Sequence, residues 1–133
     1  MEGDKDEIIG EVVEMGEENQ RMVMDISLKD LSRELEEFAK IRDWEQYHSP
    51  RNLLLAMVGE VGELSEIFQW RGEVPKGLPN WKDSDKEHLG EELSDVLLYL
   101  IRLADICGID LGVAATKKIV KNAIKYPAPR SSN

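Results

Sequence analysis

Apolar side chains recur at helical spacing from Ser27 onward and predict four helices. Each expected helix begins at a local start signal, such as a capping-box pair or a serine followed by proline. No stretch alternates with period two for long enough to predict a strand. The pattern therefore predicts an all-α fold. The expected helices run from Ser27 to about Asp43, from Ser49–Pro50 to about Gln69, from the Ser84–Glu87 pair to Gly108, and from Asp110 to about Lys125.

Two of these helices contain runs that are apolar around the whole circumference. The runs are residues 53–58, Leu-Leu-Leu-Ala-Met-Val, and residues 96–101, Val-Leu-Leu-Tyr-Leu-Ile. A helix of this kind is buried on more than one side, and the partner helices of so small a chain can hardly cover both runs. Association with a second copy, most often by two-fold symmetry, supplies the further cover. We therefore expect a four-helix bundle that assembles as a homo-oligomer.

Length and charge predict one domain with an acidic leader. The 133 residues are 33% charged and 6% aromatic, which fits a single domain of ordinary size. The net charge of −10 is uneven, because residues 1–26 hold nine acidic and two basic side chains. We expect a disordered leader over residues 1–26, the domain over residues 27–127 and a short tail over residues 128–133.

The composition also excludes several classes of partner. No basic excess is present to neutralise nucleic-acid phosphates, and no run of 18 apolar residues could span a bilayer. We therefore expect neither a nucleic-acid nor a membrane partner. Cys107 is the single cysteine, which excludes an intramolecular disulfide, and we expect it to be buried filler at a helix end. The acidic first residues predict a cytoplasmic address, with nuclear or organellar pools as alternatives.

Four acids lie in the two apolar helices where apolar residues are expected. Glu60 lies within about 20° of Leu53 around its helix, and Glu63 follows three residues later. Glu92 and Asp95 repeat this spacing on the other helix. Clustered buried carboxylates are costly unless a cation compensates their charge, and few lysines or arginines lie in these helices. All-oxygen ligands favour Mg²⁺, with Mn²⁺ as the alternative, and a Mg²⁺ cage predicts a nucleotide-like ligand.

The same acid pairs have a simpler alternative, because acids three residues apart are frequent on solvated helix surfaces. We interpret Glu66, Glu87 and Glu91 in that way. Lysine and asparagine on one face of the last helix could meet phosphate and sugar or base, or could form only a solvated basic stripe. Tryptophan is ordinarily a core or interface residue, and this is the interpretation of Trp81.

Beyond these patterns, the sequence resembles a known family. Residues 59–64, Gly-Glu-Val-Gly-Glu-Leu, and residues 91–95, Glu-Glu-Leu-Ser-Asp, resemble the E-x-x-E…E-x-x-D signature of MazG-like all-α nucleoside triphosphate pyrophosphatases. Residues 42–45, 50–54 and 68–70 resemble the dCTP pyrophosphatase branch, as does the pattern Lys118-x-x-x-Asn122-x-x-x-Tyr126-Pro127. The resemblance spans about residues 28–127.

The resemblance implies Mg²⁺-dependent hydrolysis of dCTP and of modified dCTP analogues to dCMP and pyrophosphate. It also implies a tetramer built from dimers. Four carboxylates are implied as metal ligands, namely those of Glu60, Glu63, Glu92 and Asp95. The implied substrate contacts are Trp44 and Trp70 at the base, with Tyr99, Lys118, Asn122 and Tyr126 at the nucleotide.

For the chemistry, we expect a water oriented by Glu60 to attack the α phosphorus while Lys118 stabilises the departing pyrophosphate. One position departs from the family pattern, because Leu35 stands where relatives carry a histidine in the pocket wall. Two alternatives remain open. One is a pyrophosphatase for another nucleotide such as dUTP, and the other is a non-enzymatic helical dimerisation module whose acids are stabilised by pairing alone.

Overall fold

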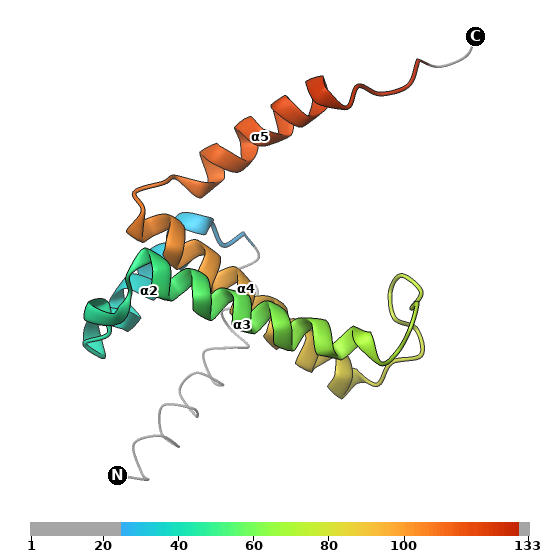
Figure 1. Ribbon diagram of the computed structural model, residues 1–133, viewed down its shortest axis with the longest axis horizontal. Helices are drawn as coiled ribbons and strands as arrows, with labels where there is room; N and C mark the ends of the chain where they lie inside the picture. Colours follow the sequence, from blue (N-terminus) through green and yellow to red (C-terminus); the bar gives the residue numbers. More distant parts are fainter. Residues whose placement is uncertain (1–24, 131–133) are drawn as a thin grey trace.

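The computed structural model describes residues 25–130, and within this range the chain is helical (Figure 1). The described residues form four α-helices, one short 3₁₀-helix and no strand, so the all-α prediction is confirmed. None of the helices in this range is both long enough and apolar enough to cross a membrane. The expected leader lies almost entirely outside the described residues. The elements are α2 (Leu28–Ile41), η1 (Glu45–Tyr47), α3 (Pro50–Gln69), α4 (Asp83–Ile106) and α5 (Leu111–Lys125).

Local capping residues explain where three of the α-helices begin. The Ser27 hydroxyl accepts a hydrogen bond from the Asp30 N–H at 3.0 Å, and the Ser27 N–H donates to the Asp30 carboxylate at 3.3 Å. This is the capping box expected at the start of α2. Ser49 caps α3 and Asp110 caps α5, each through a side-chain oxygen. These three predicted starts are confirmed.

The start of α4 differs from the expected one. The helix begins at Asp83, and its N-cap residue is Lys82, whose side chain makes no capping hydrogen bond. Ser84 therefore lies inside the first turn, and the expected capping box with Glu87 is wrong. Asp83 and Asp85 lie in this first turn, where the helix dipole favours negative charge and takes over part of the role of a cap.

The end of α4 is a sharp turn. Gly108 has a φ of 67°, a left-handed conformation that glycine adopts without strain. Its N–H donates to the Asp105 carbonyl at 3.0 Å, and the Ile109 N–H donates to the Ala104 carbonyl at 2.9 Å, which forms a Schellman motif. Cys107 is the C-cap residue before this turn and is exposed, so the expectation of a buried cysteine is wrong. It lies beyond the packed part of the helix.

Three of the four α-helices pack together, and α5 stands apart (Figure 1). α4 packs along α3 and also against α2. Beyond its first turn, α5 extends away from the other helices. The four helices of one chain therefore do not close into a single bundle. The buried apolar core is correspondingly small and consists of Ala39, Leu53, Trp81, Ile101 and Ala104, which confirms the expected burial of Trp81.

Large apolar side chains remain exposed on α3 and α4, the two helices with runs predicted to be apolar all round, and also on α5. Leu55 and Val58 on α3 are 55% and 57% exposed, because α4 covers only one side of that helix. Ile119 and Ile124 on α5 are 69% and 77% exposed. Several large apolar side chains exposed on one helix favour an interaction surface over a solvated face. The single chain thus leaves the exposed apolar side chains of α3, α4 and α5 without a covering partner.

Candidate metal and nucleotide site

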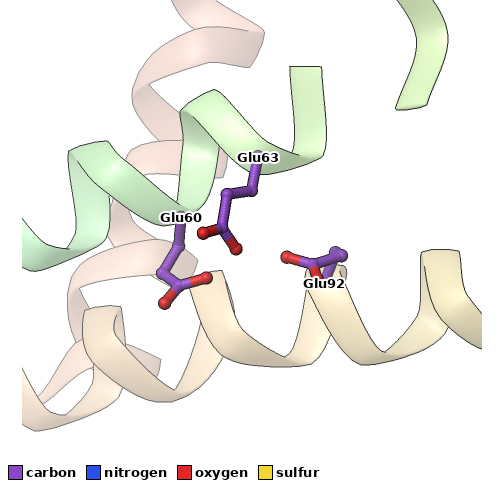
Figure 2. Close-up of side chains that lie close together, drawn as sticks. All are labelled: Glu60, Glu63 and Glu92. Atoms are coloured by element: carbon purple, nitrogen blue, oxygen red, sulfur yellow. The ribbon is translucent and has the colours of Figure 1, made fainter. Parts of the chain in front are cut away.

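Three glutamates converge between α3 and α4 (Figure 2). Glu60 and Glu63 extend from α3, and Glu92 extends from the facing side of α4. One carboxylate oxygen from each lies within 4.8 Å of the other two. The spacing of three residues places Glu60 and Glu63 on the same side of α3, and the packing of α3 on α4 turns that side toward Glu92.

Two of the three carboxyl groups, those of Glu60 and Glu92, have raised pKa values. Burial raises the pKa of Glu60, and the charges of Glu63, Asp95 and Glu92 raise it further. Burial also raises the pKa of Glu92, followed by the charge of Glu63. Within the described part of the chain, Oε2 of Glu60 and Oε2 of Glu92 are buried and have no hydrogen-bond partner. Buried carboxylate oxygens without a partner are costly, and a bound cation would compensate that cost.

A divalent cation fits this donor set. Every donor is a carboxylate oxygen, the ligand type that hard divalent cations bind. No lysine or arginine among residues 25–130 forms an ion pair with any of the three glutamates. The two unpartnered oxygens, one from each helix, are available as ligands. The residues present therefore match a divalent metal site held by α3 and α4.

Asp95, the fourth expected ligand, lies beside this group and outside it. Its side chain is exposed, and its oxygens are not among those that converge within 4.8 Å. It follows Glu92 by three residues, on the next turn of α4. Glu66 and Glu91, which the sequence assigned to the solvated surface, are both exposed.

We expect metal-free Glu60→Gln to be more thermally stable than the metal-free wild type. Because the pKa of Glu60 is raised, its ionised form destabilises the folded state at neutral pH. A neutral amide removes the cost of burying the charge and the repulsion from the neighbouring acids. The melting temperature in EDTA should rise by about 3 °C at pH 7. The difference should shrink as the pH falls through the raised pKa of Glu60, because the wild-type carboxyl then becomes neutral too.

Added Mg²⁺ should reverse this order. A ligand that binds only the folded state stabilises it, by about 2.7 kcal/mol at a hundred times its Kd, so the wild type should gain much more than Glu60→Gln. Glu91→Gln is the matched control, since Glu91 is exposed and outside the cluster. Equal shifts with Mg²⁺ in the wild type and Glu60→Gln would contradict a metal site at these residues.

The two tryptophans expected at the base lie at opposite ends of α3. Trp44 directly precedes η1, before α3 begins, and Trp70 is the C-cap residue of α3. The 20-residue helix α3, which lies between them, is about 30 Å long. Trp70 is 84% exposed and, with Glu63 and His88, lines a cavity of about 380 Å³. One base cannot contact both tryptophans of the same chain.

The expected nucleotide contacts on α5 are also distant from the carboxylates. Lys118, Asn122 and Tyr126 follow one another along one side of the α5 region and are exposed, and α5 extends away from the α3–α4 pair (Figure 1). Tyr99 lies on α4, half-buried, four residues after Asp95. A single chain therefore brings together three of the expected ligands and leaves the tryptophans and the α5 residues apart.

Arg102 and His48 carried no functional expectation from the sequence. Arg102 is buried, and its Nε donates to Nδ1 of His48 at 3.1 Å. A signal was present, because Arg102 directly follows the apolar run of residues 96–101. An arginine at the end of an apolar run needs polar partners, and here one of them lies 54 residues away in the sequence.

The described residues form an all-α fold with a cluster of three carboxylates between two helices that fits a divalent cation. The MazG-like family model matches residues 56–133, more than half of the sequence, and the chain belongs to the MazG-like family. The family resemblance seen in the acidic motifs is thereby confirmed.

Several known proteins are similar to this chain. It is 52% identical over 102 residues to dCTP pyrophosphatase 1 of Homo sapiens and 50% identical over 101 residues to that of Bos taurus. These alignments cover 77% and 76% of this chain and 60% of each relative, so the chain spans about 60% of the length of the curated relatives it matches. The solved structure of a pyrophosphatase from Archaeoglobus fulgidus is 35% identical, with a TM-score of 0.61, and the match covers 78% of this chain and 95% of that one.

Proposed function

We propose that this protein is a nucleoside triphosphate pyrophosphatase that hydrolyses dCTP, and modified dCTP analogues, to dCMP and pyrophosphate with Mg²⁺. The observation that carries the proposal is the convergence of Glu60, Glu63 and Glu92, with two buried carboxylate oxygens that lack a partner. The named activity of the mammalian relatives, at 50% and 52% identity, supports dCTP as the substrate. The cytoplasmic address predicted from the sequence stays a prediction.

In this proposal each residue of the cluster has a stated role. Glu60, Glu63, Glu92 and Asp95 hold the cation, which when bound neutralises charge on the phosphate oxygens. Glu60 also orients a water molecule and accepts its proton as the water oxygen attacks the α phosphorus. The bond from the α phosphorus to the bridging oxygen breaks, and Lys118 stabilises the charge of the departing pyrophosphate.

The proposal includes a second copy of the chain that completes the site. Two α3 helices that pair in antiparallel fashion about a two-fold axis bring Trp44 of one copy beside Trp70 of the other. Both copies then keep their carboxylates near the middle of the paired helices. The exposed apolar side chains of α3 and α4 support such pairing, because they would be covered by it.

The separation of α5 supports the same arrangement. Its exposed Ile119 and Ile124 need an apolar surface that their own chain does not supply. When α5 packs against the second copy, Lys118, Asn122 and Tyr126 reach the nucleotide held by that copy's carboxylates. We propose a homo-oligomer of this kind, with two such dimers forming the tetramer that the family resemblance implies.

A panel of nucleoside triphosphates tests the reaction. With Mg²⁺ we expect dCTP to be hydrolysed fastest, with pyrophosphate and no orthophosphate released, and no turnover in EDTA. In ¹⁸O-labelled water the label should enter dCMP, because the attack is on the α phosphorus. Label in pyrophosphate would place the attack on the β phosphorus.

Faster hydrolysis of dUTP than of dCTP would favour a pyrophosphatase for another nucleotide, an alternative that the departure at Leu35 keeps open. Failure to hydrolyse any nucleotide would favour the non-enzymatic dimerisation module.

A further inference from the structure

The backbone of Trp44 is held by a tight turn at the end of α2. Asp43 has a φ of 56°, in the left-handed region, and its N–H donates to the Lys40 carbonyl at 3.1 Å. The Trp44 N–H donates to the Ala39 carbonyl at 2.8 Å, so the two bonds form a Schellman motif with aspartate where glycine is usual. The turn therefore fixes the position of the Trp44 backbone. The orientation of the indole depends on the side chains that contact it.

Two rings flank the Trp44 indole. The centroid of the Phe38 ring lies 5.6 Å from that of the indole, and the centroid of the His48 ring lies 6.4 Å from it, both in edge contacts. Trp44 is 44% exposed, so part of its surface is free to contact a ligand. Phe38 belongs to α2, whereas His48 directly follows η1. The orientation of the indole therefore depends in part on how His48 is held.

His48 is held from α4. The Nε of Arg102 donates to Nδ1 of His48 at 3.1 Å, so the imidazole accepts at Nδ1 and carries its proton on Nε2. Burial and then the positive charge of Arg102 lower the pKa of His48, which favours this neutral form, while Glu45 acts in the opposite direction. Among residues 25–130 this is the only side-chain to side-chain hydrogen bond, ion pairs aside, that joins different elements.

Arg102 is buried and is held by a second hydrogen bond besides the one to His48. It is 4% exposed, and its guanidinium also donates to Oδ2 of Asp105 at 3.0 Å, which balances its charge. Asp105 is exposed, and an ion pair with an exposed partner adds little stability, so the ion pair alone does not explain a buried arginine here. Arg102 belongs to α4, the helix that also carries Glu92. Its bond to His48 therefore ties the Trp44 region to the helix of the carboxylate cluster.

We propose that Arg102 and His48 are positioning residues that hold the Trp44 indole in the orientation needed to stack on the substrate base. This inference rests on the proposed function, because it requires Trp44 to contact the nucleotide. Neither residue transfers a proton or contacts the phosphates. Loss of the link should therefore weaken binding of the nucleotide and leave the chemical step largely unchanged.

Three substitutions separate the hydrogen bond from the ring contact. His48→Phe keeps a ring beside Trp44 and removes the acceptor, Arg102→Met removes the donor and keeps most of the volume, and His48→Asn keeps an acceptor near the position of Nδ1. We expect KM for dCTP to rise about tenfold in His48→Phe and Arg102→Met, with kcat within about twofold of the wild type. His48→Asn should lie between these variants and the wild type. A loss of kcat at unchanged KM would overturn the proposal.

A ¹⁹F NMR measurement that needs no turnover tests whether the Arg102–His48 hydrogen bond orients the Trp44 indole. The chain has three tryptophans, and with 5-fluorotryptophan each gives a ¹⁹F resonance that single Trp→Phe variants assign. In His48→Phe and Arg102→Met we expect the Trp44 resonance to shift or broaden and the Trp70 resonance to stay. Circular dichroism on the same samples should show that the helices are intact.

The two measurements separate the possible failures. An unchanged Trp44 resonance in folded variants would show that the link does not orient the indole, which overturns the proposal whatever the kinetics. A shifted resonance with unchanged KM would show that the orientation of Trp44 does not matter to the substrate, which also overturns it. Absence of dCTP turnover in the wild type would overturn the proposed function instead, while the resonance shift would still measure the link.

Discussion

Glu92→Gln should abolish dCTP hydrolysis while the helices and the oligomeric state are retained. Glu92 is the carboxylate that α4 contributes to the cluster and a proposed metal ligand, and its buried Oε2 has no partner in the described part of the chain. Loss of one metal ligand removes several kcal/mol of charge stabilisation in the transition state, and about 4 kcal/mol corresponds to a thousandfold loss of kcat/KM. Circular dichroism and sedimentation should match the wild type, because one of several repelling charges has been removed.

The neighbouring acid provides the control. Glu91→Gln makes the same chemical change on an exposed residue outside the cluster, and its kcat/KM should stay within about twofold of the wild type. Glu63→Gln and Asp95→Asn should lose activity as Glu92→Gln does. Asp95→Asn is the more informative of these, because Asp95 lies outside the three converging glutamates. Mg²⁺-dependent activity near the wild-type level in Glu92→Gln would remove the basis for the metal site.

Mixing two inactive variants should restore activity if α5 serves the site of a second copy. Glu63→Gln disrupts the carboxylate cluster, and Lys118→Ala removes the phosphate contact proposed for α5, so each variant alone should be nearly inactive. In a mixed dimer, one site combines the intact carboxylates of one chain with the intact α5 of the other. Half of randomly paired dimers are mixed and each has one intact site, so about a quarter of wild-type activity should return.

The experiment needs exchange of subunits, which co-expression of the two variants with different affinity tags provides. Mixing Glu63→Gln with Glu92→Gln is the control, since both changes lie in the same cluster and no combination of the two chains contains an intact one. Sedimentation should show a dimer or tetramer in every sample. Mixed oligomers that stay inactive would show that each chain folds its own α5 onto its own site.

The sequence by itself determined the features that depend on neighbouring residues. Ser27, Ser49 and Asp110 predict helix starts because a cap bonds to an amide three residues later. Glu60 and Glu63 could be assigned to one face of α3 because the helical repeat depends only on spacing along the chain. The acidic motifs on two helices were sufficient to indicate the family, which the match over residues 56–133 confirms.

Only the tertiary structure decided which residues of different helices lie close together. The convergence of Glu92 with the α3 glutamates, and the position of Asp95 beside them, depend on the register in which α4 packs along α3. The bond from Arg102 to His48 joins residues 54 positions apart, and no local pattern encodes such a pair. The separation of α5 from the cluster follows from its direction after the Gly108 turn. Contacts between distant segments depend on the packing of whole helix faces, and spacing along the chain does not determine that packing.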